Sequence, residues 1–190
     1  IIDGTITPVF CGAATRLWGV VAVMDAIVES FPRHTAKKVE KLADGSDAEI
    51  KVDGETALFV FKTIADPFLG KMSLFKVMNG SVSRDMVLTN LTSDAQEKMA
   101  HIYIMKGNKQ TEVDELACGD IGMVAKLSNT NTNDTLSLNG NVSYLPVRYP
   151  KPYYTQAMSP VGKGDEGKIS QGIAKLLEED LTIGYENNAE

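Results

Sequence analysis

The stretch from Phe59 to Ser81 constrains the fold of this chain more than any other part of the sequence. Its first run, Phe59 to Ile64, is rich in the aromatic and β-branched residues that favour strands. The second run, Lys71 to Met78, alternates between two faces with a period of two residues. Asp66 to Gly70 supplies turn chemistry between them, and Asn79-Gly80 ends the second run with a pair typical of hairpin turns. This stretch therefore predicts two adjacent antiparallel strands.

Short runs of the same character recur beyond this pair, with turn signals between them and no helical period. They are Met86 to Leu91, Met99 to Met105, Gly122 to Leu127 and Thr135 to Leu138. The segment Ser128 to Asp134 consists of residues that favour turns. Strands at this spacing are typical of a small antiparallel barrel or sandwich. We therefore expect residues 55–148 to form one mainly β domain.

The N-terminal residues 1–33 have a different pattern. Ile6 to Cys11 is a short apolar run that suits a buried strand, and it ends in a turn. Apolar residues then recur at helical spacing and predict a helix from Trp18 to Ser30, with Pro32 beyond it. A strand followed by a helix suggests the closing unit of an α/β domain. Because the chain also begins without Met, we expect it to be a fragment of a longer protein.

Two further segments complete the expected organisation. Residues 34–54 are crowded with charges and glycine, which predicts a linker or loop. At the other end, residues 149–190 begin with the stiff Tyr149 to Pro152. A strand at Tyr153 to Met158, a helix near Asp165 to Glu179 with Asp165 as N-cap, and a strand at Leu181 to Tyr185 then predict a truncated βαβ unit.

The sequence contains no recognisable catalytic or metal-binding motif. His34 and His101 have no second ligand at a helical or hairpin spacing, and no P-loop or G-x-S-x-G motif occurs. Asn108 to Thr111 begins like the N-K-x-D guanine motif but has Thr in place of Asp. A net charge of −6 argues against binding DNA or free RNA through the overall field, and no apolar run is long enough to span a membrane. We therefore expect no catalytic residues, metal site or cofactor in this chain.

Several strings, in their order and spacing, resemble bacterial translation elongation factor G and its ribosomal GTPase relatives. At the start, Pro8 to Ala14 and Asp25 to Val28 resemble the guanine loop and last helix of the GTPase domain. In the middle, Phe61-Lys62, Asp66 to Lys71 and Ala117 to Ile121 resemble domain II. At the end, Tyr149 to Pro152, Asp165 to Lys168 and Leu177 to Asp180 resemble the beginning of domain III. The last group is most similar to the second, paralogous type of the factor.

The resemblance implies both a fold and a function. The fold is mainly β with α/β ends: a six-stranded Greek-key β-barrel of the translation-factor type, flanked by the C-terminal strand and helix of a GTPase domain and by a truncated ferredoxin-like βαβ unit. The function is GTP hydrolysis that drives tRNA–mRNA translocation on the ribosome, in the cytoplasm. Domain II would pack on the GTPase domain and touch small-subunit rRNA. GTP and Mg²⁺ would belong to the full-length parent.

The resemblance also implies positions for a guanine-binding loop. Gly12, Ala13 and Ala14 occupy that loop, although Ala13 replaces a Ser and lacks its hydroxyl. Two other departures affect glycine positions of the family: Lys126 and Asn133 each replace a Gly. Asn tolerates the left-handed backbone conformation that a turn glycine often adopts.

Four lysines on the expected barrel loops, Lys62, Lys71, Lys106 and Lys109, are candidate contacts to rRNA phosphates, which position a protein without reading base sequence. The alternative is that they only solubilise the surface. The function also has alternatives. A ribosome-protection or recycling GTPase of the same superfamily would share this architecture, and a non-enzymatic β-barrel module that binds RNA or protein would share the central domain.

Overall fold

A computed structural model of the chain describes residues 1–2, 5–33, 36–66, 68–162 and 164–186. It consists of two compact units, residues 1–38 and residues 39–190. In the first unit, a short 3-10 helix, η1 (Ala14–Arg16), precedes helix α1 (Val20–Ser30). Gly19 stands at the N-cap of α1 with a φ of 78°, a conformation that glycine adopts without strain. The predicted helix is therefore confirmed.

The predicted strand at Ile6 to Cys11 is wrong, because these residues have no strand pairing. A β-strand is stabilised by hydrogen bonds to a neighbouring strand, and the described part of the first unit supplies none. Helix α1 also has no buried residue. The apolar face that predicted it is exposed at Val21, Met24 and Val28, because no other described element covers it.

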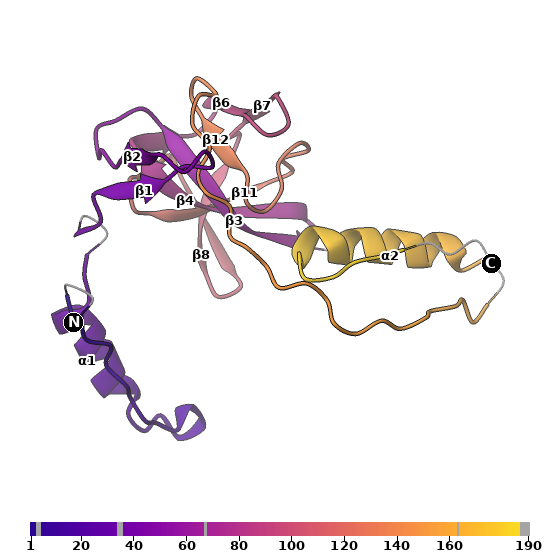
Figure 1. Cartoon of the computed structure of the whole chain (residues 1–190), viewed down its shortest axis with the longest axis horizontal. Coiled ribbons are helices and arrows are strands. Elements are labelled where there is room, and N and C mark those ends of the chain that lie inside the picture. The colour runs from indigo at the N-terminus through magenta and orange to yellow at the C-terminus, as the bar shows by residue number, and fades with distance from the viewer. Residues whose placement is uncertain (3–4, 34–35, 67, 163, 187–190) are drawn as a thin grey trace. The chain divides into compact units, whose positions relative to one another are not determined.

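The second unit is built on an antiparallel sheet with the order β7-β6-β12-β3-β4-β11-β8-β9 (Figure 1). Its members are β3 (Ala57–Asp66), β4 (Gly70–Asn79), β6 (Val87–Asn90), β7 (Ala95–Lys98), β8 (Ile102–Lys106), β9 (Lys109–Val113), β11 (Ile121–Ala125) and β12 (Thr135–Ser137). Strands β5 (Ser81–Ser83) and β10 (Glu115–Ala117) form a separate ribbon, and β1 (Val39–Lys41) pairs with β2 (Asp47–Glu49). The expectation of a mainly antiparallel β protein is thus confirmed.

The predicted hairpin forms: β3 and β4 pair over nearly their whole length, from Ala57↔Asn79 to Asp66↔Gly70. The prediction that Asn79-Gly80 makes a hairpin turn is wrong, since β5 pairs with β10 and not with β4. Gly80 instead turns the chain with a φ of 63°, and a Cβ there would collide with the carbonyl oxygen of Gly54. Glycine is required at this position by close packing as well as by the turn.

The six-stranded Greek-key barrel stays a prediction. The strand pairings leave β7 and β9 as edges of an eight-stranded order, and no pairing among the described residues joins these edges. The sheet nevertheless surrounds one apolar core, to which most strands contribute. The buried members of this core are Leu58, Val60, Phe75, Val77, Val82, Leu88, Met99, Ile102, Leu116, Val124, Leu127 and Leu136.

The expectations for the two segments that flank the β domain, residues 34–54 and 149–190, are only partly met. Residues 34–54, expected to be a linker or loop, contain the β1–β2 hairpin, whose turn is closed by Asp44: its Oδ1 accepts from Ser46 N at 2.9 Å. In residues 149–190, α2 (Glu166–Glu179) confirms the predicted helix, but the described residues at 153–158 and 181–185 form no strand. Asp165 precedes α2 without capping it, because its carboxylate binds Lys168 Nζ at 2.8 Å. The domain boundaries themselves stay predictions.

The two positions where the family glycine is replaced both have left-handed backbone: Lys126 at φ 66° and Asn133 at φ 80°. A non-glycine residue in this region is strained by about 1–2 kcal/mol. Lys126→Gly is therefore expected to raise the free energy of unfolding by about 0.5–1 kcal/mol, since glycine relieves the strain but gains chain entropy when unfolded. Urea denaturation checks this. The matched control Lys126→Ala removes the same charge but keeps the strain, and it should give no gain.

Candidate functional site

The outer face of the central sheet carries large apolar side chains on β3 and β11, with Lys76 of β4 between them. Phe59 on β3 is in register with Lys76 on β4, and Lys76 with Ile121 on β11. The residues that follow Phe59 and Lys76, Val60 and Val77, point to the opposite side and are fully buried in the core. A sheet with two apolar faces needs cover on both, so the outer face is a candidate binding surface.

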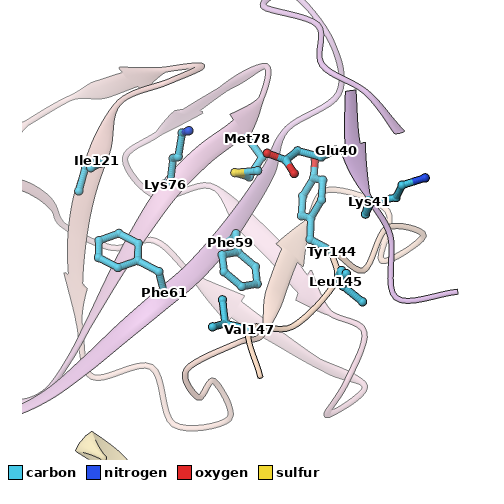
Figure 2. A pocket seen from close by; sticks show the side chains of 10 residues that line it. All are labelled: Glu40, Lys41, Phe59, Phe61, Lys76, Met78, Ile121, Tyr144, Leu145 and Val147. Atoms are coloured by element: carbon cyan, nitrogen blue, oxygen red, sulfur yellow. The ribbon is translucent and has the colours of Figure 1, made fainter. Parts of the chain in front are cut away.

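This face forms the floor of a groove with a volume of about 560 Å³ (Figure 2). Its lining is Glu40, Lys41, Phe59, Phe61, Lys76, Met78, Ile121, Tyr144, Leu145 and Val147. Figure 2 shows Phe59, Tyr144 and Val147 gathered together and the end of Lys41 directed away from them. Burial raises the pKa of Tyr144 to about 12, so its phenol is neutral at physiological pH. The lining is mostly apolar, and its charged members are Glu40, Lys41 and Lys76.

Sequence reasoning missed this groove. The signal that points to it is the pair Phe59 and Phe61, which alternate with the core residues Leu58 and Val60. The walls formed by Glu40 and by residues 144–147 come from segments that were expected to be linker or domain end, and only the fold brings them to the sheet.

A second feature is the turn-rich segment 128–134, which is held by buried carboxylates. Asp134 Oδ2 accepts from Asn90 Nδ2 at 2.8 Å and from Asn131 N at 2.7 Å. Glu97 Oε1 accepts from Asn129 N at 2.6 Å. Hydrogen bonds to a charged acceptor are stronger than neutral ones, so these carboxylates fix the loop in one conformation.

Lys71 and Lys126 lie beside this loop. Lys71 Nζ donates to Asn131 Oδ1 at 2.8 Å, and Lys126 N donates to the Lys71 carbonyl oxygen at 2.7 Å. Asp134 and Glu97 are both buried, and their carboxylates accept hydrogen bonds from the loop instead of facing the solvent. The surface at this corner therefore combines lysines with amide side chains, in a chain whose net charge is −6.

The structure does not bring the four predicted lysines together. Lys106 and Lys109 pair across the β8–β9 turn. Because β11 runs antiparallel to both β4 and β8, this turn lies toward the Ile121 end of β11, whereas Lys71 lies toward its Ala125 end. Lys62 is exposed in the middle of β3. The candidate contacts thus form at least two separate groups.

The turn between β3 and β4 is stabilised by its own carboxylate. Asp66 Oδ1 accepts from Phe68 N and from Leu69 N, each at 2.8 Å, and these bonds lower the pKa of Asp66 below its usual value. Phe68 is almost completely exposed, at 95%. Pro67, which the sequence placed in this turn, lies outside the described residues. The Asp66 carboxylate is therefore occupied by backbone N–H groups of the turn, and the neighbouring Phe68 ring is exposed to solvent.

The predicted guanine loop is closed by backbone hydrogen bonds. Ala13 N donates to the Trp18 carbonyl oxygen at 3.1 Å, and Trp18 N donates back to Ala13 O at 3.2 Å. A Cβ at Gly12 would come within 2.7 Å of the same Trp18 oxygen, so only glycine fits there. Arg16 stacks over the Trp18 ring, 5.2 Å from its centroid. The N–H of Ala13 is therefore engaged inside the loop, while Ala14 starts η1.

A charge cluster joins Glu112 on β9 to His101, just before β8, and to Arg84, just after β5. His101 Nδ1 is 2.7 Å and Arg84 Nη1 is 3.3 Å from Glu112 Oε1. The hydrogen bond with His101, aided by the positive charges of His101 and Arg84, lowers the pKa of Glu112 below its usual 4.5. A carboxyl whose pKa is lowered on folding stabilises the protein above its unfolded pKa, and this contribution disappears as pH falls through the folded pKa.

We therefore expect Glu112→Gln to destabilise the chain at about pH 6 and to have a smaller effect in acid, once the pH has fallen below the lowered pKa of the folded state and the wild-type carboxyl is protonated in both states. Urea midpoints at the two pH values measure this difference. His101→Ala removes the main cause of the shift, so the pH-dependent part of the Glu112→Gln effect should shrink in that background. An effect of equal size at both pH values would contradict the assignment.

Among the described residues, no group of three His, Cys, Asp or Glu side chains could hold a metal ion. No helix in the described part of the chain is long and apolar enough to cross a membrane.

Comparison with known proteins identifies the β domain. Residues 55–139 match the family model described as elongation factor G domain 2. These residues belong to the elongation factor G domain 2 family. The match begins just before β3 and ends after β12, so it contains all eight strands of the central sheet. The resemblance drawn from Asp66 to Lys71 and from Ala117 to Ile121 is thereby confirmed.

Homology extends to the rest of the chain. Elongation factor G of Chlamydia trachomatis serovar D and that of serovar A are each 32% identical to this chain over 197 aligned residues, which cover 100% of the chain. The chain spans 28% of the length of these relatives. A crystal structure of a protein from Thermus thermophilus matches with a TM-score of 0.70 and 25% identity, covering 90% of this chain and 24% of that one.

Homology to elongation factor G implies GTP and Mg²⁺ in the parent family, but the described residues do not build a site for either. The sequence has no phosphate-binding P-loop. The one family element for the guanine base, Gly12 to Ala14, has its central N–H bonded to Trp18. In the described ranges, no three His, Cys, Asp or Glu side chains are grouped as metal ligands.

Proposed function

We propose that this chain is part of a translation factor of the elongation factor G type and that its β domain docks the factor on small-subunit rRNA. The observation that carries the proposal is the homology to elongation factor G along the whole chain, with the domain 2 match at its centre. The chain itself is catalytically silent. GTP hydrolysis coupled to tRNA–mRNA translocation, in the cytoplasm, is the activity proposed for a parent with a complete GTPase domain.

Two lysine groups are the proposed phosphate contacts. One is Lys71, next to the rigid 128–134 loop; the other is Lys106 with Lys109 at the β8–β9 turn. Lys62 stands apart from both groups, exposed on β3, which is separated from β8 by β4 and β11. Phosphate contacts release counterions, so each one lost should reduce the slope of log affinity against log salt by about 0.7–0.9.

Co-sedimentation of the full chain with small ribosomal subunits across a salt series tests this docking. Lys71→Glu and the pair Lys106→Glu with Lys109→Glu are assayed separately, with Lys51→Glu on the β1–β2 side as a matched change of surface charge. We expect weaker binding and a shallower salt slope for the group that contacts rRNA. Absence of binding by the full chain, unimproved when a GTPase domain is supplied, would refute the docking role.

The guanine loop is proposed to contact the base only as part of a complete GTPase domain. A fluorescent GTP analogue should show no saturable binding to this chain, whereas micromolar affinity would contradict the proposal. The parent reading frame separates the alternatives. An upstream P-loop with a complete N-K-x-D motif supports a GTPase, and a reading frame without them supports a non-enzymatic β-barrel module.

A further inference from the structure

The segment that enters the second unit and the segment that leaves its sheet are hydrogen-bonded to each other. Leu42, just after β1, bridges with Tyr144. Ala43 N donates to the Ser143 carbonyl oxygen and Leu145 N donates to the Lys41 carbonyl oxygen, each at 2.9 Å. About one hundred residues of sequence separate these two segments, so only the fold makes them neighbours.

Packing reinforces this junction. Leu42 and Ala48 of the hairpin pack on a small apolar cluster of Ala57, Met78 and Tyr144, which is separate from the main core. The hairpin and residues 143–147 therefore share one side chain, Tyr144, as a common anchor. The adjacent groove is lined by Glu40 and Lys41 on one side and by residues 144–147 on the other, so this side of the junction is not closely packed (Figure 2).

The outgoing segment is tied to the sheet mainly through side chains. Tyr144 N donates to Thr135 Oγ1 at 2.9 Å. Asn133 forms a reciprocal pair with Val147: Val147 N donates to Asn133 Oδ1, and Asn133 Nδ2 donates to Val147 O, both at 3.0 Å. Bonds of this kind open at lower free energy than the backbone ladder of buried strands.

We propose that the β1–β2 hairpin and residues 143–147 form a clasp that opens and moves as one unit. A displacement of the chain arriving at Val39 is then passed directly to the chain that leaves at Val147 toward α2. The main core stays unchanged, because the clasp packs on the small cluster of Ala57, Met78 and Tyr144, whose residues are not among those of the main core. This inference rests on the contacts within the second unit and does not depend on the proposed function.

Amide hydrogen exchange of the full chain, followed by NMR, tests the clasp from both sides. On the outgoing side, Asn133→Gly removes both bonds to Val147 and keeps the backbone, because φ at this position is 80°. On the incoming side, Asp44→Ala removes the bonds to Ser46 that close the hairpin turn. Coupling between two sites is reciprocal, so each variant should affect the opposite side.

We expect Asn133→Gly to accelerate exchange at Ala43 by about thirtyfold, the value for the loss of a pair of ordinary hydrogen bonds at about 1 kcal/mol each. Asp44→Ala should accelerate exchange at Leu145 and Val147 to a comparable degree. The amides of Val77 and Gly119, which bond within the main sheet region, serve as internal controls and should not change. Acceleration confined to the mutated side would overturn the proposal, and so would an equal rise at the control amides, since that rise reports global unfolding.

Discussion

Replacing Phe75 with alanine is expected to lower the free energy of unfolding by about 4 kcal/mol, the largest effect of any substitution considered for this chain. The Phe75 ring is fully buried in the centre of the main core. It packs directly over Gly122 on the neighbouring strand, where an added Cβ would come within 2.7 Å of the ring Cζ. Truncation leaves a cavity that the rigid β3–β4–β11 ladder cannot collapse to fill. Urea denaturation followed by circular dichroism measures the loss.

Phe68→Ala is the matched control for this prediction. It removes the same ring from a position that is 95% exposed in the β3–β4 turn, so the free energy of unfolding should change by less than about 0.5 kcal/mol. A loss below about 1 kcal/mol for Phe75→Ala would mean that the ring is not the centre of the core.

Asp134→Ala is expected to lower the free energy of unfolding by about 3 kcal/mol. The carboxylate is 7% exposed and holds both Asn90 Nδ2 and Asn131 N. Asn90 is fully buried, so the substitution leaves its amide with an unsatisfied donor in addition to removing two hydrogen bonds to a charged acceptor. The same urea experiment measures this effect, and exchange at the Asn131 amide should rise with it.

Asn131→Ala is the control in the same loop. Its side chain is exposed and bonds only Lys71 Nζ among the described contacts, while its backbone N–H to Asp134 is retained. We expect a change within about 0.5 kcal/mol. If both variants lost stability equally, the loop as a whole, and not the buried carboxylate, would be responsible.

The family resemblance came from several strings in their order and spacing, whereas six of the eight strands of the central sheet could be predicted because their signals are local. The run from Phe59 to Met78 carries its own alternation and turn residues, and β3 and β4 form where these indicate. The same holds for α1 and α2, whose apolar period is complete within each helix. Asn133 was expected at a position that needs left-handed backbone, and its φ is 80°.

Strands β7 and β9 were not predicted, because local sequence patterns do not mark every strand. β7 (AQEK) and β9 (KQTEV) are polar edge strands, and their sequences lack the apolar alternation that would mark them. Their strand conformation comes from pairing with β6 and β8. The reverse error occurred at Ile6 to Cys11, where an apolar run suggested a strand but no partner strand is present in the described residues.

The candidate site was less predictable than the fold. Lys71, Lys106 and Lys109 were named from the sequence, but their separation into two groups follows from the antiparallel order of β4, β11 and β8. The groove and the clasp were not predicted at all, because each joins residues near position 40 to residues near position 145.

Local patterns in the chain were sufficient to predict the central hairpin and both helices, and the order and spacing of its strings were sufficient to suggest the family. The folded arrangement was needed to find that the buried carboxylates of Glu97, on β7, and Asp134 both bond the 128–134 loop, that the expected linker forms a hairpin, and that this hairpin is bonded to residues 143–145. This division follows from the range of the interactions. Periodicity and turn chemistry act over a few residues, whereas burial, pairing and groove formation depend on partners that the folded chain brings together from distant positions.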